Sequence, residues 1–285
     1  MRRTPEKQTS RNHGVAYMLL NVARHWVKAD EQTIKTLTLF CKNLAPNKDG
    51  MTRKNKERLR QFDDPRQLNM LLDLPATMMR EACATAEPTV LEARVAQLAI
   101  AVEILLMAPL RIGNIAALEI GRTLFLNGTK SGHIVIAGAE VKNDYDIEFP
   151  LPQVTLRMID TYLKRFHPLL APTGSTMLFP SLDGGHKRST VLSHQLQQCI
   201  GRRCGIRMHA HLFRHLAGKI YLEAFPGAYG VIKILLGHKN IDTTIRTYCG
   251  TEHAAVYRRY DEFLEARRGV GRQKTPIAHN GRRIR

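Results

Sequence analysis

Residues 235–248 read LLGHKNIDTTIRTY, and no other stretch of the chain is as informative. A short apolar run ends at Gly237, His238 follows directly, and a Thr-Thr pair precedes Tyr248. A histidine can donate or accept a proton, and a tyrosine can act as a nucleophile. The phenol titrates at about 10, however, so it needs a cationic surrounding or a general base at neutral pH. Positively charged residues elsewhere in the chain are therefore candidates for the same site as Tyr248.

Two upstream strings supply such charge. In HLFRH, His211 and Arg214 are three residues apart, which puts both side chains on one face of a helix. Alone, this spacing also fits a surface pair or a capping role. Further upstream, the string PLRIGNIAAL surrounds Arg111, and Lys142 falls on the turn of a predicted β-hairpin.

In this order the residues resemble the catalytic set of the tyrosine recombinases, the phage integrase family. The Leu-Gly-His, Thr-Thr and Tyr sequence is similar to the closing motif of that family, and PLRIGNIAAL is similar to the segment around its first catalytic arginine. The resemblance covers most of residues 90–250. Six positions match: Arg111, Lys142, His211, Arg214, His238 and Tyr248.

The resemblance implies DNA strand breaking and rejoining through a 3′-phosphotyrosyl intermediate, with Tyr248 as the nucleophile. The two arginines are always-charged forks for the non-bridging oxygens. By the same resemblance, His211 assists proton transfer, Lys142 protonates the leaving 5′ oxygen and His238 hydrogen-bonds the phosphate. Such catalysis depends on positioning and charge, so we expect no metal or nucleotide cofactor.

Some of these assignments have alternatives. Arg111 and Lys142 belong to a chain with 43 Lys and Arg residues, so each could be a solvated surface cation. Lys130 is a second candidate for the hairpin lysine. Tyr257 or Tyr260 could replace the predicted nucleophile, although packing in a periodic final helix explains both better.

The chain departs from the family pattern at two positions. Tyr248 follows His238 by ten residues, where nine is the commoner spacing in the family. Asn114 stands where relatives often have an acidic residue; a neutral amide can still form hydrogen bonds there. The spacing leaves open a non-catalytic DNA-binding protein of the same fold.

The composition favours a polyanionic partner. The 285 residues carry a formal charge of +18, which points first to nucleic acid. The longest apolar stretch, 98–110, contains Glu103 and is too short to span a bilayer. No signal peptide is visible, so we expect a cytoplasmic, DNA-associated protein without a membrane partner.

The cysteines predict neither a disulfide framework nor a metal site. Five cysteines form an odd, scattered set. Cys199 and Cys204 lie near His209 and His211 in the sequence and could imitate a zinc site. Their spacing matches none of the usual zinc-finger patterns, so structural thiols are the better interpretation.

We predict an α+β, mainly helical fold in three parts. A short helical N-terminal DNA-binding domain covers 1–64 and contains amphipathic helices around 15–26 and 34–44. The catalytic domain covers 65–268, and a basic, disordered, DNA-seeking tail covers 269–285.

Within the catalytic domain, a long helix begins after Pro88 and ends before Pro109. Two strands, 133–136 and 146–149, are expected to form a small hairpin or sheet, and the remainder reads as helical. The final helix, 252–267, resembles the segment that relatives dock onto a neighbouring protomer, although its apolar face fits its own domain equally well.

Three functions therefore compete. A site-specific recombinase or integrase of a mobile element would act as a homo-tetramer on synapsed double-stranded DNA, with accessory DNA-bending proteins as further partners. A relaxing enzyme similar to type IB topoisomerases would need no defined sites. A non-catalytic protein would bind DNA without forming a covalent adduct.

Overall fold

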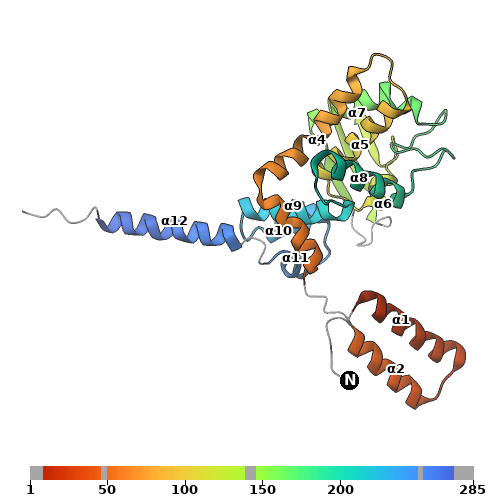
Figure 1. Cartoon of the computed structure of the whole chain (residues 1–285), viewed down its shortest axis with the longest axis vertical. Helices are drawn as coiled ribbons and strands as arrows, with labels where there is room; N and C mark the ends of the chain where they lie inside the picture. Colours follow the sequence, from red (N-terminus) through yellow and green to blue (C-terminus); the bar gives the residue numbers. More distant parts are fainter. Residues whose placement is uncertain (1–8, 46–49, 139–145, 250–252, 273–285) are drawn as a thin grey trace, which may run out of the picture. The chain divides into compact units, whose positions relative to one another are not determined.

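The computed structural model describes residues 9–45, 50–138, 146–249 and 253–272. Its contacts divide the chain into two compact units, Met1–Gly50 and Met51–Arg285. Both are largely helical, and one three-stranded sheet lies in the second unit (Figure 1). The predicted α+β, mainly helical fold class is confirmed. In the described ranges, no helix combines the length and apolar character needed to cross a membrane.

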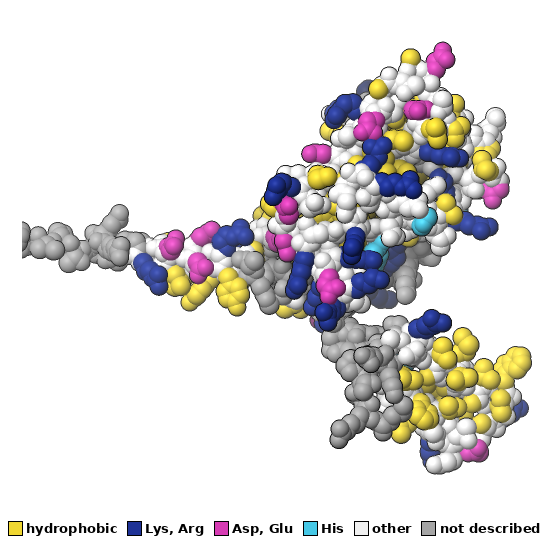
Figure 2. Space-filling model, viewed as in Figure 1, with side chains coloured by type: hydrophobic (Ala, Val, Ile, Leu, Met, Phe, Trp, Pro, Cys, Tyr) yellow, Lys and Arg dark blue, Asp and Glu magenta, His cyan; other side chains and the backbone are white. Residues whose placement is uncertain are grey.

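The first unit is a helical hairpin with an exposed apolar face. It contains α1 (Ser10–Asn21), a π-helical turn η1 (Val22–Val27) and α2 (Glu31–Leu44). Among its described residues, the buried hydrophobic side chains are Leu20 and Cys41, and Trp26 is 88% exposed. The apolar side chains of this unit are visible as the yellow surface in Figure 2. Two helices are too few to bury both of their own apolar faces.

The second unit holds the remaining elements. In chain order they are α3 (Arg53–Leu59), η2 (Arg60–Asp63), α4 (Pro65–Ala84), α5 (Val90–Met107), α6 (Ile112–Ala116), β1 (Leu124–Asn127), β2 (Ser131–Ile136), β3 (Ile147–Pro150), α7 (Gln153–Arg165), η4 (His167–Leu169), α8 (Ser189–Cys204), α9 (Ala210–Ala224), α10 (Tyr229–Leu236), α11 (Ile241–Tyr248) and α12 (His253–Arg272).

The division between the units differs from the boundary predicted after residue 64. The segment α3–η2 belongs to the second unit, because Leu59 and Phe62 are buried in its core. Lys219 of α9 donates to Asp63 at 2.6 Å, which ties η2 to the helix that carries HLFRH. Side-chain contacts over more than a hundred residues of chain decide this membership, and local composition does not reveal them.

The core is built around α5. This helix is apolar on nearly all sides, as expected of a helix surrounded by others, and it packs against α4, α7, α8 and α9 (Figure 1). Thr89 and Glu92 form a capping box at its start. The helix predicted between Pro88 and Pro109 is therefore present.

The sheet has the strand order β1-β2-β3 and is antiparallel throughout. Strands β2 and β3 are the predicted hairpin, with Ile134 opposite Phe149. Strand β1, which pairs Leu124 with Ile134, was not predicted. The predicted turn that carries Lys142 lies outside the described residues, and so does 273–285 of the predicted tail; α12 continues to Arg272.

Candidate active site

Helix α9 carries three polar side chains into one region of the second unit. His211 and Arg214 are three residues apart, and His215 follows one turn after His211, so their side chains share a face. The His211 and His215 rings make an edge-on contact with centroids 5.0 Å apart. Arg214 is only 4% exposed, which is unusual for a guanidinium.

Arg214 is buried because its side chain joins distant parts of the chain. Its Nη1 donates to the Pro109 carbonyl at 2.6 Å, and its Nη2 donates to the Leu236 carbonyl. The first carbonyl lies two residues before Arg111 and the second two residues before His238. One guanidinium therefore brings the three sequence motifs together.

Arg111 is the cation of this group that keeps its side chain unpaired. It is half-buried at the N-cap of α6, and the described residues offer its guanidinium neither a hydrogen bond nor a carboxylate. The burial of Arg214 and, as the smaller cause, the charge of Arg111 lower the pKa of Arg214 to about 10. Two guanidinium groups held close without an acid between them are suited to bind an anion.

His238 is positioned by the end of α10. Gly237 adopts a left-handed conformation, with φ of 58°, and this closes the helix in the way that favours glycine. His238 Nδ1 then lies 2.8 Å from the buried Thr244 Oγ1, which leaves Nε2 available for a ligand. Burial, followed by the charges of Arg214 and Arg111, lowers the pKa of His238 to about 4, so the ring is neutral at physiological pH.

His211 has a similar electrostatic environment. Partial burial, with Arg214 and Arg111 nearby, lowers its pKa below the ordinary value. A neutral imidazole can accept a proton, which suits the role of general base. The candidate site thus combines two charged guanidinium groups with neutral imidazoles.

Tyr248 lies beside this group but faces inward. Its ring is 1% exposed, and its hydroxyl donates to the Arg214 carbonyl at 3.1 Å and lies 3.3 Å from His215 Nδ1. The ring rests on Gly218, where a Cβ would come within 2.4 Å of Cε1. Burial raises the pKa of Tyr248 above its ordinary value, and the charge of Arg214 opposes that effect.

The other residues discussed from the sequence lie apart from this group or are not described. Lys142 lies outside the described residues. Lys130 is exposed between β1 and β2, and Tyr257 and Tyr260 are exposed on α12. Asn114 has a buried Nδ2 that finds no acceptor among the described residues. This is the position at which relatives often place an acid.

The cysteines and histidines that could imitate a zinc site do not form one among the described residues. In the described part of the chain, no three His, Cys, Asp or Glu side chains are placed to hold a metal. All five cysteines, each within the described ranges, are free thiols.

Sequence reasoning missed three residues that shape the site. His215 contacts the Tyr248 hydroxyl, Thr244 contacts His238, and Gly218 makes room for the Tyr248 ring. The four-residue spacing between His211 and His215 was a usable signal for the first. Nothing in the local sequence indicates that Gly218 faces an aromatic ring thirty residues later.

The sequence matches one family model. The model of the phage integrase family matches residues 75–254. No curated protein sequence matches the chain. Among solved structures, XerH recombinase bound to its difH substrate in a pre-cleavage complex is 15% identical, with 82% of this chain and 66% of that chain covered and a TM-score of 0.47. This chain thus spans slightly less than two thirds of XerH.

XerA recombinase is 17% identical, with 91% and 85% covered and a TM-score of 0.46. A lambda integrase dimer bound to a COC′ core site is 15% identical, with 84% and 77% covered and a TM-score of 0.40. The family match, unlike these, rests on sequence and extends over more than half of the residues. The chain belongs to the phage integrase family.

Proposed function

We propose that the chain is a site-specific DNA recombinase that cleaves and rejoins DNA through a phosphotyrosine intermediate. The observation that carries this proposal is the convergence of Arg111, His211, Arg214 and His238 from three separate segments into one cationic group. Family membership supplies the reaction class. Double-stranded DNA is the proposed substrate.

The proposed reaction begins with attack of the Tyr248 oxygen on a backbone phosphorus. The phenolic proton passes to a base, for which the neutral His211 is suited. Arg111 and Arg214 stabilise the charge on the non-bridging oxygens, and His238 Nε2 donates a hydrogen bond to the phosphate. The bond from phosphorus to the 5′ oxygen breaks, and that oxygen accepts a proton. By resemblance to the family, we assign the donation of this proton to Lys142. Attack by a 5′ hydroxyl reverses these steps.

Tyr248 must leave its resting position for this chemistry. Its hydroxyl is engaged with the Arg214 carbonyl and near His215, and its high pKa opposes ionisation. We propose that DNA binding shifts α11 so that the phenol exchanges these contacts for a place beside the guanidinium groups. There, positive charge would favour the phenolate.

The proposed assembly is a homo-tetramer on two synapsed DNA duplexes. Both compact units, Met1–Gly50 and Met51–Arg285, would contact each duplex. Helix α12 exposes Val256, Tyr260 and Phe263, an apolar surface suited to a neighbouring protomer. Accessory DNA-bending proteins are compatible with such an assembly.

The test is capture of the covalent adduct. The full chain is incubated with sheared DNA from its own genome, denatured, and the attached DNA ends are sequenced. We expect 3′ attachment at a few discrete sites, lost in Tyr248→Phe and retained in the matched variants Tyr257→Phe and Tyr260→Phe. Attachment scattered over many sequences would instead indicate a relaxing enzyme of the topoisomerase type.

Burial of the Tyr248 hydroxyl also favours a second candidate, a non-catalytic DNA-binding protein with the same fold. The orphaned amide of Asn114 supports it, because the site lacks the acidic group common in relatives. Tight DNA binding without an adduct on any genomic sequence would favour this candidate over the recombinase.

A further inference from the structure

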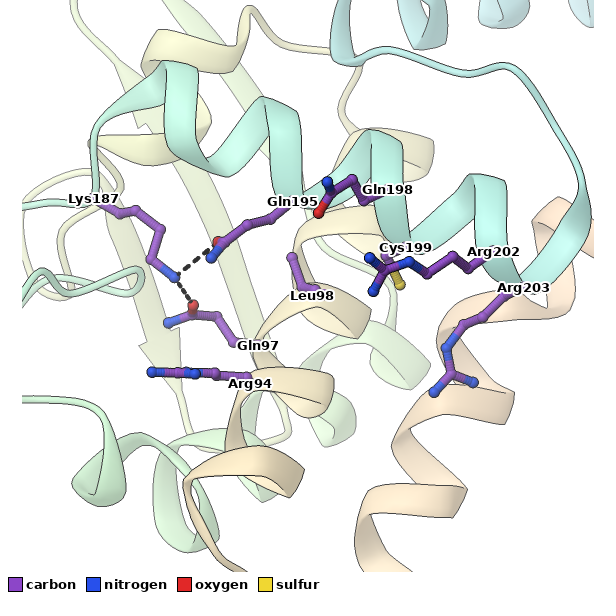
Figure 3. Close-up of a pocket in the computed structure, with 9 residues that line it drawn as sticks. All are labelled: Arg94, Gln97, Leu98, Lys187, Gln195, Gln198, Cys199, Arg202 and Arg203. Carbon is purple, nitrogen blue, oxygen red and sulfur yellow. Dashed lines mark hydrogen bonds between the residues drawn. The ribbon is translucent and has the colours of Figure 1, made fainter.

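A second cationic site lies between α5 and α8, apart from the candidate active site. It is a pocket of about 350 Å³, shown in Figure 3, to which both helices contribute polar side chains. That size is within the usual range for small-ligand sites. The lining residues are Arg94, Gln97, Leu98, Lys187, Gln195, Gln198, Cys199, Arg202 and Arg203.

The charge of the pocket is mostly unbalanced. No carboxylate lines it, and among its four cations Arg203 alone has an acidic partner in the described part of the chain, Glu81 at 2.6 Å. Arg94 and Arg202 are both exposed, and Figure 3 shows Arg94 near Lys187 at one end of the pocket and Arg202 beside Cys199 at the other. The charge of Arg94, together with burial, lowers the pKa of Lys187 to about 8. Arg94 and Lys187 therefore repel one another, and an anion would relieve that repulsion.

Lys187 is held in place by a chain of buried polar groups. Its Nζ donates to the Gln97 side-chain oxygen and to the Gln195 side-chain oxygen at 3.3 Å. Gln97 is 1% exposed and donates to the Tyr162 hydroxyl, which in turn donates to the Leu178 carbonyl. An ammonium group has three donors, so Lys187 keeps one for a ligand.

We propose that this pocket binds phosphate groups, with Arg94 and Lys187 as ligands at one end and Arg202 at the other. Guanidinium forks match phosphate oxygens, and the fixed ammonium adds a point charge. The phosphate is carried either by a small molecule or by the DNA backbone. The site does not depend on the proposed strand-cleavage reaction, because none of its residues belongs to the candidate active site.

The experiment uses the full chain and three variants. Arg94→Gln and Arg202→Gln remove one exposed guanidinium each from the pocket. Arg157→Gln, on the exposed face of α7, removes the same charge elsewhere and is the matched control. Thermal unfolding with increasing inorganic pyrophosphate measures binding of a small phosphate, and binding of a short DNA duplex at several salt concentrations measures backbone contacts.

Two outcomes support the proposal. If pyrophosphate stabilises the wild type and Arg157→Gln, and each pocket variant binds it about tenfold more weakly or worse, the pocket takes a small phosphate. If pyrophosphate has no effect but each pocket variant lowers the salt slope of DNA binding by about one relative to the control, the pocket takes a DNA phosphate.

The proposal is overturned if the pocket variants match Arg157→Gln in both measurements. Neither measurement requires strand cleavage, so the result stands whether or not a covalent adduct forms. A failure of the recombinase proposal and a failure of this site are therefore distinguishable.

Discussion

Replacing Gly218 with alanine tests how Tyr248 is packed. The new Cβ would lie 2.4 Å from Tyr248 Cε1 and 2.7 Å from Cζ. Non-bonded carbons prefer about 3.5–4.0 Å, so the ring would have to retreat by roughly 1 Å. The ring is 1% exposed, which leaves it little space to do so.

Two opposing contributions set the expected magnitude. Overpacking a core costs about 1–3 kcal/mol, whereas alanine stabilises a helix interior over glycine by about 1 kcal/mol. Because several ring atoms are too close, we expect the larger cost to apply. The free energy of unfolding of Gly218→Ala should therefore fall by about 1–2 kcal/mol, measured by urea denaturation.

A double-mutant cycle identifies the cause. In a Tyr248→Ala background the clash is gone, so Gly218→Ala should stabilise the protein by up to about 1 kcal/mol. Gly201→Ala in α8 is the matched control, because its nearest neighbour would be 3.9 Å away and the change should be stabilising in both backgrounds. Equal effects of Gly218→Ala with and without the tyrosine ring would refute this description of the packing.

Three further predictions concern the surroundings of the site. Lys219→Met should lower the free energy of unfolding by about 1 kcal/mol in urea denaturation, because the ion pairs with the partly exposed Asp63 and Glu223 are both lost. An unchanged midpoint would show that these ion pairs contribute nothing. Burial lowers the pKa of His215 to about 4. Between pH 6.5 and 4, the unfolded chain therefore binds a proton at His215 that the folded chain does not bind. The free energy of unfolding should decline as the pH falls through that window, by up to about 3 kcal/mol. His215→Gln should flatten this part of the profile, and parallel profiles would contradict the assignment. Thr244→Val removes the hydrogen-bond partner of His238 Nδ1. This change should slow adduct formation about tenfold in a timed capture assay, while the affinity for DNA stays unchanged. A rate equal to that of the wild type would mean that Thr244 does not position the imidazole.

The order of the candidate residues could be read from the sequence, but the buried position of Tyr248, the proposed nucleophile, could not. The three-residue spacing of His211 and Arg214 is enough to predict that they share a helix face. Gly237 likewise indicates that a helix ends just before His238. The inward direction of Tyr248 depends on a glycine in another helix. Such complementarity belongs to the tertiary structure and leaves no local pattern.

The elements of the fold likewise include some that were predicted from the sequence and some that were not. The long apolar helix α5 was predicted because prolines mark both of its ends, and the β2–β3 pair because its strands alternate around a polar turn. Strand β1 has only four residues, too few for a convincing alternation. The association of α3 and η2 with the second unit depends on contacts such as that of Lys219 with Asp63, which join residues 156 positions apart.

The hydrogen bonds of Arg214 determine at what stage of protein synthesis the cationic group can form. Its two carbonyl partners lie 105 residues before it and 22 residues after it. Closing such a long loop is entropically unfavourable and can be completed only after Leu236 has left the ribosome. A nascent or prematurely ended chain therefore carries the arginines without their shared geometry. DNA cleavage would therefore require a polypeptide in which these distant segments are already in contact.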